Sequence, residues 1–274
     1  MPCRQAFSKT IIPQTYESVR GFVHKEIGQI NTYSLTFDYW TSISSKSFLT
    51  ITIHFLTQEF KLRDYVLKTI EIKEDHTGVN TAKVIKSVLQ EYSLPNGSHH
   101  KIWAVTDGAA NMKKTVKELQ WPHILCFSHI LHNCLTTNSW FKEGGISIFL
   151  EKCRDLIKFF RLSPKNSNAL KQIQEKLKLP QIKLKLDVLT RWNSMYDMLE
   201  RLVDNRVAIV NLALEKQEVN KLSLTNNEWQ ELIDVKETLS PFKAITDLLS
   251  SSKMPSISIL KPIINNIEQN IYFR

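Results

Sequence analysis

Two aspartates stand at the ends of apolar runs, where their carboxylates could hold a metal ion. Asp38 ends such a run in FDYWTS, and Asp107 ends another in AVTDGAANM. If the two runs form neighbouring strands, both carboxylates emerge at adjacent carboxyl-terminal tips, and their oxygens suit Mg²⁺. Two such ions, about 3.5–4 Å apart, can catalyse phosphodiester cleavage. The pair predicts a metal-dependent site, although either aspartate alone is more typical of a turn or helix cap.

A second group of potential metal ligands lies in WPHILCFSHILHNCL. Its members are His123, Cys126, His129, His132 and Cys134. Cys126 and His129 have a spacing found in zinc sites, and any four of the five could form a tetrahedral site. Read as a straight strand, however, the run places Cys126 and His129 on opposite faces. We therefore do not expect zinc in this chain.

The segment LTRWNSMYD contains an arginine next to a tryptophan. The Arg191 guanidinium could bind a phosphate, and the Trp192 ring could stack on an unpaired base. The alternative is a buried tryptophan that anchors the start of a helix, with the arginine at its rim. Asn193 or Ser194 would cap that helix.

Positive charge is concentrated just before this pair. From Lys152 to Arg191 there are 11 Lys or Arg against 3 Asp or Glu, whereas the 83 residues after Arg191 carry 9 against 11. Such a segment is typical of phosphate contact. Its lysines include Lys183 and Lys185, which we predict to contact DNA. A solvated helical face is the alternative.

The first half of the chain reads as strands and one helix. Strands are predicted for LTFDYW, SFLTITIHFLT, DYVLKTIEI and KIWAVTD, and HILCFSHI is a weaker fifth candidate. Apolar residues at helical spacing predict a helix from Gly78 to Tyr92. The first three strands could form an antiparallel meander, after which the helix would bring the fourth strand back parallel to an earlier one.

The second half reads as helical, since no glycine follows Gly145. Helices are predicted for Ser147 to Arg161 and Ser194 to Lys216. Thr225 and Glu228 fit a capping box, and Ser240-Pro241 fits an N-cap followed by proline at the first helical position.

Composition describes a globular protein of 274 residues with 42% hydrophobic and 23% charged residues. Four cysteines are too few for a disulfide scaffold. No apolar run approaches the roughly 18 residues of a membrane span, and the N-terminus lacks the order of a secretory signal, so we expect no membrane and a cytosolic or nuclear protein. A net charge of +9 favours a polyanionic partner. Serine-nucleophile elbows, phosphate-binding glycine loops and His-Glu-x-x-His are absent.

Four motifs together resemble one family. FDYWTS, VTDGAANM, CFSHILH and TRWNS occur in the order and rough spacing of hAT transposases and of the domesticated zinc-finger BED-type proteins derived from them, over roughly Pro13 to Ile267. The resemblance implies an α/β fold, a ribonuclease H-like mixed sheet interrupted by a large all-helical insertion domain. The expected domains are an N-terminal helical lead-in at 1–30, the core at 31–137 and the insertion at 138–274.

The resemblance also implies roles for individual residues. Asp38 and Asp107 would be the first two catalytic carboxylates, holding Mg²⁺ or Mn²⁺. Cys126, His129 and Trp40 would support the active site. Arg191 and Trp192 would contact DNA at the cleavage site. Gly108 stands where many relatives have Asn.

The family's remaining features are missing from this chain. Its third acidic ligand is a Glu in the C-terminal dimerisation region, and the chain stops at Arg274 with no motif around its last acidic residue, Glu268. A paired-ligand BED finger is absent too. We therefore expect a truncated or domesticated transposase core, nuclear and DNA-binding, with an incomplete site. Any homo-oligomer would form through the missing region. The alternatives are an active transposase completed by a missing C-terminal segment, and a protein-interaction module that has lost DNA binding.

Overall fold

The computed structural model describes residues 2–28, 30–95, 102–136, 146–188, 192–250 and 257–271. Its strands are β1 (Tyr33–Thr41), β2 (Ser47–Leu56), β3 (Leu62–Glu71), β4 (Ile102–Thr106) and β5 (His123–Leu125). The helices of the first half are α1 (Arg4–Ala6), a π-helical stretch (Phe7–Ile11), α2 (Ile12–Ile27), α3 (Gly78–Glu91), α4 (Ala110–Leu119) and α5 (Phe127–Thr136). Those of the second half are α6 (Ile146–Arg161), α7 (Pro164–Lys176), α8 (Trp192–Asp204), α9 (Arg206–Glu215), α10 (Gln217–Leu222), α11 (Asn226–Leu249) and α12 (Ile257–Ile271).

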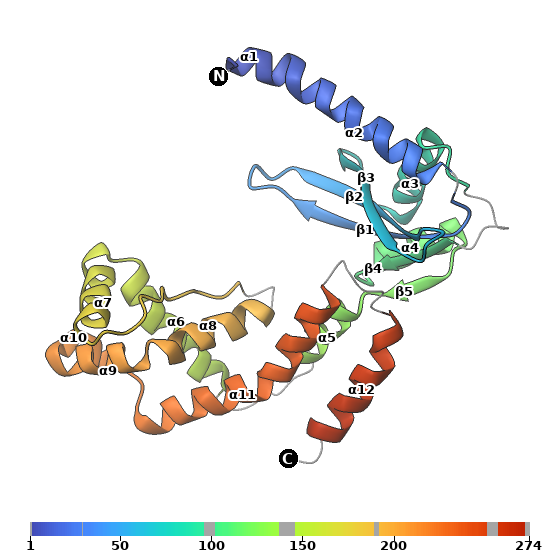
Figure 1. The fold of residues 1–274 in the computed structure, drawn as a ribbon. Helices are drawn as coiled ribbons and strands as arrows, with labels where there is room; N and C mark the ends of the chain where they lie inside the picture. Colours follow the sequence, from blue (N-terminus) through green and yellow to red (C-terminus); the bar gives the residue numbers. More distant parts are fainter. Residues whose placement is uncertain are drawn as a thin grey trace. The chain divides into compact units, whose positions relative to one another are not determined.

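The five strands form one mixed sheet in the order β3-β2-β1-β4-β5 (Figure 1). The strands β1, β2 and β3 are an antiparallel meander, β4 returns parallel to β1 after α3, and β5 lies parallel to β4. The predicted meander and helical crossover are therefore confirmed. Because β1, β4 and β5 run parallel, their carboxyl-terminal ends lie at the same end of the sheet.

One face of the sheet is covered by helices. The buried cluster combines alternate strand residues such as Leu35, Ile51 and Ala104 with Ile85 of α3 and Met112 of α4. The intervening strand residues face the other way, where Trp40, Val66 and Trp103 remain exposed. Because successive side chains of a strand point to opposite faces, the covered face fixes which residues the other face presents.

The helices after α5 have a core of their own. It contains Leu156 and Phe160 of α6, Leu199 of α8 and Leu232 of α11. By internal contacts the chain divides into two compact units, with the boundary between His129 and Ile130 inside α5. The mixed α/β fold expected from the sequence is thus present, with many helices accompanying the five-stranded sheet. None of the helices that the structure describes has the length and apolarity to cross a bilayer.

Three local predictions differ from the structure. The weak fifth strand is present only as β5, over the first three residues of HILCFSHI, and α5 takes the last four. The single helix predicted for Ser194 to Lys216 is two helices, α8 and α9, which separate at Asn205. Pro241 lies inside α11 and does not start a helix. The carbonyl left without a donor belongs to Glu237, which is exposed and can bond to water. Buried residues on both sides, Leu239 and Thr246, keep the helix continuous.

Candidate functional site

Asp38 and Asp107 lie near the carboxyl-terminal ends of β1 and β4, two neighbouring parallel strands. The last paired residues of β1 and β4 are Thr36 and Val105. The same offset sets Asp38 opposite Asp107, which directly follows β4. On the other side of β4, the Cys126 N–H donates to the Thr106 carbonyl at 2.8 Å, continuing the pairing with β5. Three consecutive strands therefore carry Asp38, Asp107 and Cys126 side by side.

The electrostatics of Asp38 agree with this placement. Its pKa is raised, first by partial desolvation and then by the negative charge of Asp107. The nearby His129 lowers the pKa of Asp38. The two carboxylates are thus close enough for the charge of Asp107 to disfavour ionisation of Asp38, a condition that a bound cation relieves.

The turn after β4 holds Asp107 in place. The Asp107 Oδ1 atom accepts a hydrogen bond from the Ala109 N–H at 3.0 Å. Between them, Gly108 has a φ of 81°, in the left-handed region. A Cβ at Gly108 would come within 3.0 Å of the Leu125 side chain. Glycine suits this turn, and asparagine is one of the few other residues that enter the left-handed region readily.

Cys126 and His129 lie at the junction of β5 and α5. The His129 N–H donates to the Cys126 carbonyl at 3.0 Å, in the first turn of the helix. The prediction that they occupy opposite faces of a strand is therefore wrong, because the strand ends before Cys126. His123 instead bonds to Thr106 at 2.9 Å, and burial lowers its pKa. Among the residues that the structure describes, no three His, Cys, Asp or Glu side chains are arranged to hold a metal ion.

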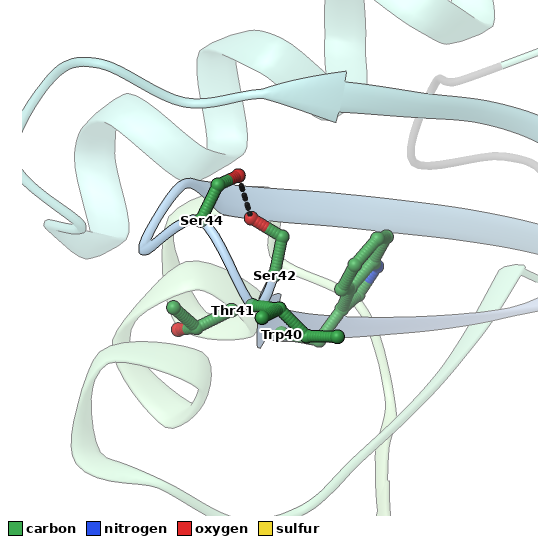
Figure 2. Close-up of a pocket in the computed structure, with 5 residues that line it drawn as sticks. Trp40, Thr41, Ser42 and Ser44 are labelled. Carbon is green, nitrogen blue, oxygen red and sulfur yellow. Dashed lines mark hydrogen bonds between the residues drawn. The ribbon is translucent and has the colours of Figure 1, made fainter.

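Trp40 lies two residues beyond Asp38, on the same face of β1. Its ring stacks on Phe48 with centroids 4.7 Å apart, and its Nε1–H donates to Thr50 Oγ1 at 2.9 Å. Trp40 is 45% exposed. It borders a shallow recess lined by five consecutive residues, Trp40 to Ser44 (Figure 2). The sequence did not single out Phe48 or Thr50; the alternation of β2 against the register of β1 was the signal that could have found them.

Of the two residues predicted to contact DNA at the cleavage site, Trp192 is described by the structure and Arg191 is not. Arg191 lies outside the described residues. Trp192 begins α8 and is only 4% exposed, and its backbone N–H donates to His132 Nδ1 at 3.4 Å. In this conformation the indole anchors a helix and its faces are covered by the core, so stacking on a base stays a prediction.

Most of the basic segment is matched by acidic side chains. Lys185 pairs with Asp197, whereas Lys183 is exposed and has no ion pair within the described part of the chain. Further ion pairs engage Lys152 with Glu228, Arg154 with Glu151 and Asp187, Lys158 with Glu151 and Asp155, Lys171 with Glu175, and Lys176 with Glu215. Several of these acids lie outside the segment, so the charge count overstated its local field.

The site fits a hard divalent cation better than zinc. Asp38 and Asp107 offer carboxylate oxygens, the ligands that Mg²⁺ and Mn²⁺ prefer. One Asp107 oxygen is held by the turn, which leaves the other available. Asp38 and Asp107 could thus offer two oxygen ligands to such an ion.

The sheet order, the level carboxylates and the separate helical unit define a ribonuclease-like class of protein. Family comparisons agree: the ZBED1 RNase-like domain matches residues 36–133, and the ZBED1 RNase-like helical domain matches residues 124–238. Together with the relatives below, these matches show a hAT-family transposase-like protein.

Three relatives show how similar this chain is to known members of the family. Zinc finger BED domain-containing protein 4 of Homo sapiens is 25% identical over 99% of this chain and 24% of its own length. The transposable element Hobo transposase of Drosophila melanogaster is 30% identical over 85% of the chain and 33% of its length. The putative AC transposase of Zea mays is 25% identical over 83% and 29%. The chain thus spans about a quarter to a third of these relatives.

Proposed function

We propose that this chain is a DNA-binding transposase-like core that uses Asp38 and Asp107 to hold Mg²⁺ or Mn²⁺. The single observation that carries the proposal is the register of β1 and β4, which sets the two carboxylates level on adjacent strands. The relatives named as transposases support DNA as the partner. A DNA partner implies a nuclear location, and oligomer formation stays a prediction.

The residues of the site divide the work between binding and positioning. Bound metal ions would activate the attacking oxygen and stabilise the leaving oxygen of a phosphodiester. Asp38 projects from a strand paired on both sides, and the Ala109 N–H orients Asp107. Because the backbone already holds both carboxylates in position, little rearrangement would be needed when a metal ion binds. Two carboxylates alone would hold such ions weakly, so we propose weak cleavage or none by Asp38 and Asp107 without a further acidic ligand.

A metal-dependent cleavage assay tests the proposal. The chain is incubated with hairpin and terminal-repeat DNA in Mg²⁺ or Mn²⁺, and DNA affinity is measured in parallel. Any cleavage should disappear in Asp38→Asn and Asp107→Asn, while Glu59→Gln, on an exposed turn, should behave as the parent. Cleavage that survives Asp107→Asn would overturn the assignment of the site. Robust cleavage lost in both variants would instead favour a complete enzyme.

The ion pairs of the basic segment favour a second candidate, a protein-interaction module without DNA binding. The salt dependence of DNA affinity distinguishes the two. Each phosphate contact contributes about −0.9 to the slope of log affinity against log salt. DNA binding predicts a clearly negative slope that Lys183→Ala makes shallower. A slope near zero would support the interaction module.

A further inference from the structure

The turn between β1 and β2 is built rigidly. The Ser42 N–H donates to the Lys46 carbonyl at 2.8 Å, and the Ser45 N–H donates to the Ser42 carbonyl at 2.9 Å. The Ser42 hydroxyl accepts from the Lys46 N–H at 3.1 Å and contacts Ser44 Oγ at 3.0 Å, the bond that Figure 2 shows. At the base of the turn, Trp40 is fixed by Phe48 and Thr50. These bonds hold the backbone of the turn and the Trp40 ring in place.

This rigid turn exposes apolar surface beside the acidic pair. Ile43, within the turn, is fully exposed. The recess next to it is lined by Trp40, Thr41, Ser42, Ile43 and Ser44, none of which carries a charge. Lys46, at the end of the turn, is paired with Glu71. An uncharged, flat group fits such a surface better than a phosphate does.

We propose that the Trp40–Ser44 turn is a binding site for an unpaired nucleobase of the DNA strand at Asp38. The inference rests on the proposed DNA-binding function and names the ligand of this surface. Trp40 offers the aromatic face on which a base stacks. Ile43 is the kind of apolar side chain that separates neighbouring bases when inserted between them. Because Trp40 lies two residues beyond Asp38 on the same strand face, a base held there sits close to a phosphate at the carboxylates.

The sheet contains a matched control for this turn. The turn between β2 and β3 repeats the same bonds: the Thr57 N–H donates to the Lys61 carbonyl and the Phe60 N–H to the Thr57 carbonyl, both at 2.9 Å. It also exposes a large apolar side chain, Phe60, at 86%. Since β2 runs from one turn to the other, the second turn lies at the far end of β2 from Trp40. The second turn therefore has the same backbone bonds and a similar exposed apolar side chain, but it does not lie near Asp38.

The test compares three DNA probes of one sequence: a full duplex, the duplex with one unpaired thymine, and the duplex with an abasic unit in place of that thymine. Equilibrium affinities are measured for the 274-residue chain. We expect it to bind the unpaired thymine about tenfold more tightly than the abasic probe, the effect of one stacked base. Trp40→Ala and Ile43→Ser should bring this ratio towards one without changing affinity for the abasic probe. Trp40→Phe should keep most of the preference for the unpaired thymine over the abasic probe. Phe60→Ala should keep all of this preference.

The outcomes separate the two proposals. Equal affinity of the parent chain for all three probes would overturn the base-binding site and leave DNA binding intact. Binding of no probe would overturn both. A loss of the ratio in Phe60→Ala as large as in Ile43→Ser would also overturn the site, since apolar exposure alone would then explain the effect. Ile43 is fully exposed, so Ile43→Ser should keep the parent's melting temperature and remain informative even if Trp40→Ala fails to fold.

Discussion

At the scale of single residues, the acidic pair costs stability when no cation is bound. The pKa of Asp38 is raised by desolvation and by Asp107, so its ionised form is less favourable in the folded chain than in the unfolded one. The free energy of unfolding should therefore fall as the pH rises from about 3.9, the ordinary value of an aspartate, through the raised folded pKa. The full penalty is present at neutral pH. Metal sites commonly combine this instability with affinity for the ion.

Asp38→Asn should consequently raise the melting temperature at neutral pH without divalent metal, and the difference should vanish below the pKa of an unfolded aspartate. Added Mn²⁺ or Mg²⁺ should stabilise the parent chain but not the variant, because a ligand that binds only the folded state shifts the equilibrium towards it. Thermal melts over a pH and metal series provide the measurement. A variant that is destabilised at neutral pH would contradict the assignment.

At the scale of elements, two hairpin turns contain strained residues. Ser45 and Phe60 have φ values of 60° and 58°, in the left-handed region that non-glycine residues enter at a cost. Three-residue hairpin loops need this conformation at one position, which glycine usually occupies. The sequence at these turns therefore departs from the residue that the backbone favours.

Phe60→Gly should stabilise the chain by about 0.5–1 kcal/mol, since relief of the left-handed strain exceeds the entropy that glycine adds to the unfolded chain. Phe60 is largely exposed, so its removal sacrifices little burial. Chemical denaturation measures the difference, and Phe60→Ala, which keeps the strain, is the control. Equal stabilities for the two variants would show that the turn is unstrained.

The segment from 177 to 188, between α7 and α8, is held by a buried ion pair. Arg154 on α6 bonds through Nε and Nη2 to Asp187, with distances of 2.9 to 3.2 Å, and the Asp187 side chain is only 3% exposed. The Ser194 hydroxyl adds bonds to the backbone N–H and carbonyl of Val188. These contacts fix Asp187 and Val188 against α6 and α8.

Arg154→Ala should lower the free energy of unfolding by about 3–5 kcal/mol, because it leaves a buried carboxylate without a partner. Arg161→Ala, at the exposed end of the same helix, should change it by less than about 0.5 kcal/mol. Denaturant titration followed by circular dichroism gives both values. A small effect of Arg154→Ala would mean that water replaces the guanidinium at Asp187.

At the scale of the whole molecule, two separate cores imply two cooperative units. Ile51→Ala creates a cavity in the first core and Leu199→Ala in the second. Each should cost about 2–5 kcal/mol in its own unit. Calorimetry should therefore show that each variant lowers one transition and leaves the other in place. A single transition that both variants lower equally would show that the units unfold together.

The sequence alone determined much of the local structure. Short runs rich in β-branched and aromatic residues predicted the meander strands, helical periodicity predicted α3, and Thr225 and Glu228 form the predicted capping box. These features depend on contacts between residues close together in the chain, so short patterns carry the information. The order of the elements also favoured a parallel return of the fourth strand, because a helical crossover permits it.

Only the tertiary structure decided the register and the electrostatics. Asp38 and Asp107 come together because β1 pairs with β4, a strand far from it in the chain. The neutralisation of the basic segment depends on equally distant partners, as when Lys152 meets Glu228, 76 residues away. Composition counts charges along the chain, whereas Coulomb interactions act through space. For the same reason the burial of Trp192 and the exposure of Ile43 emerged only once the cores had formed.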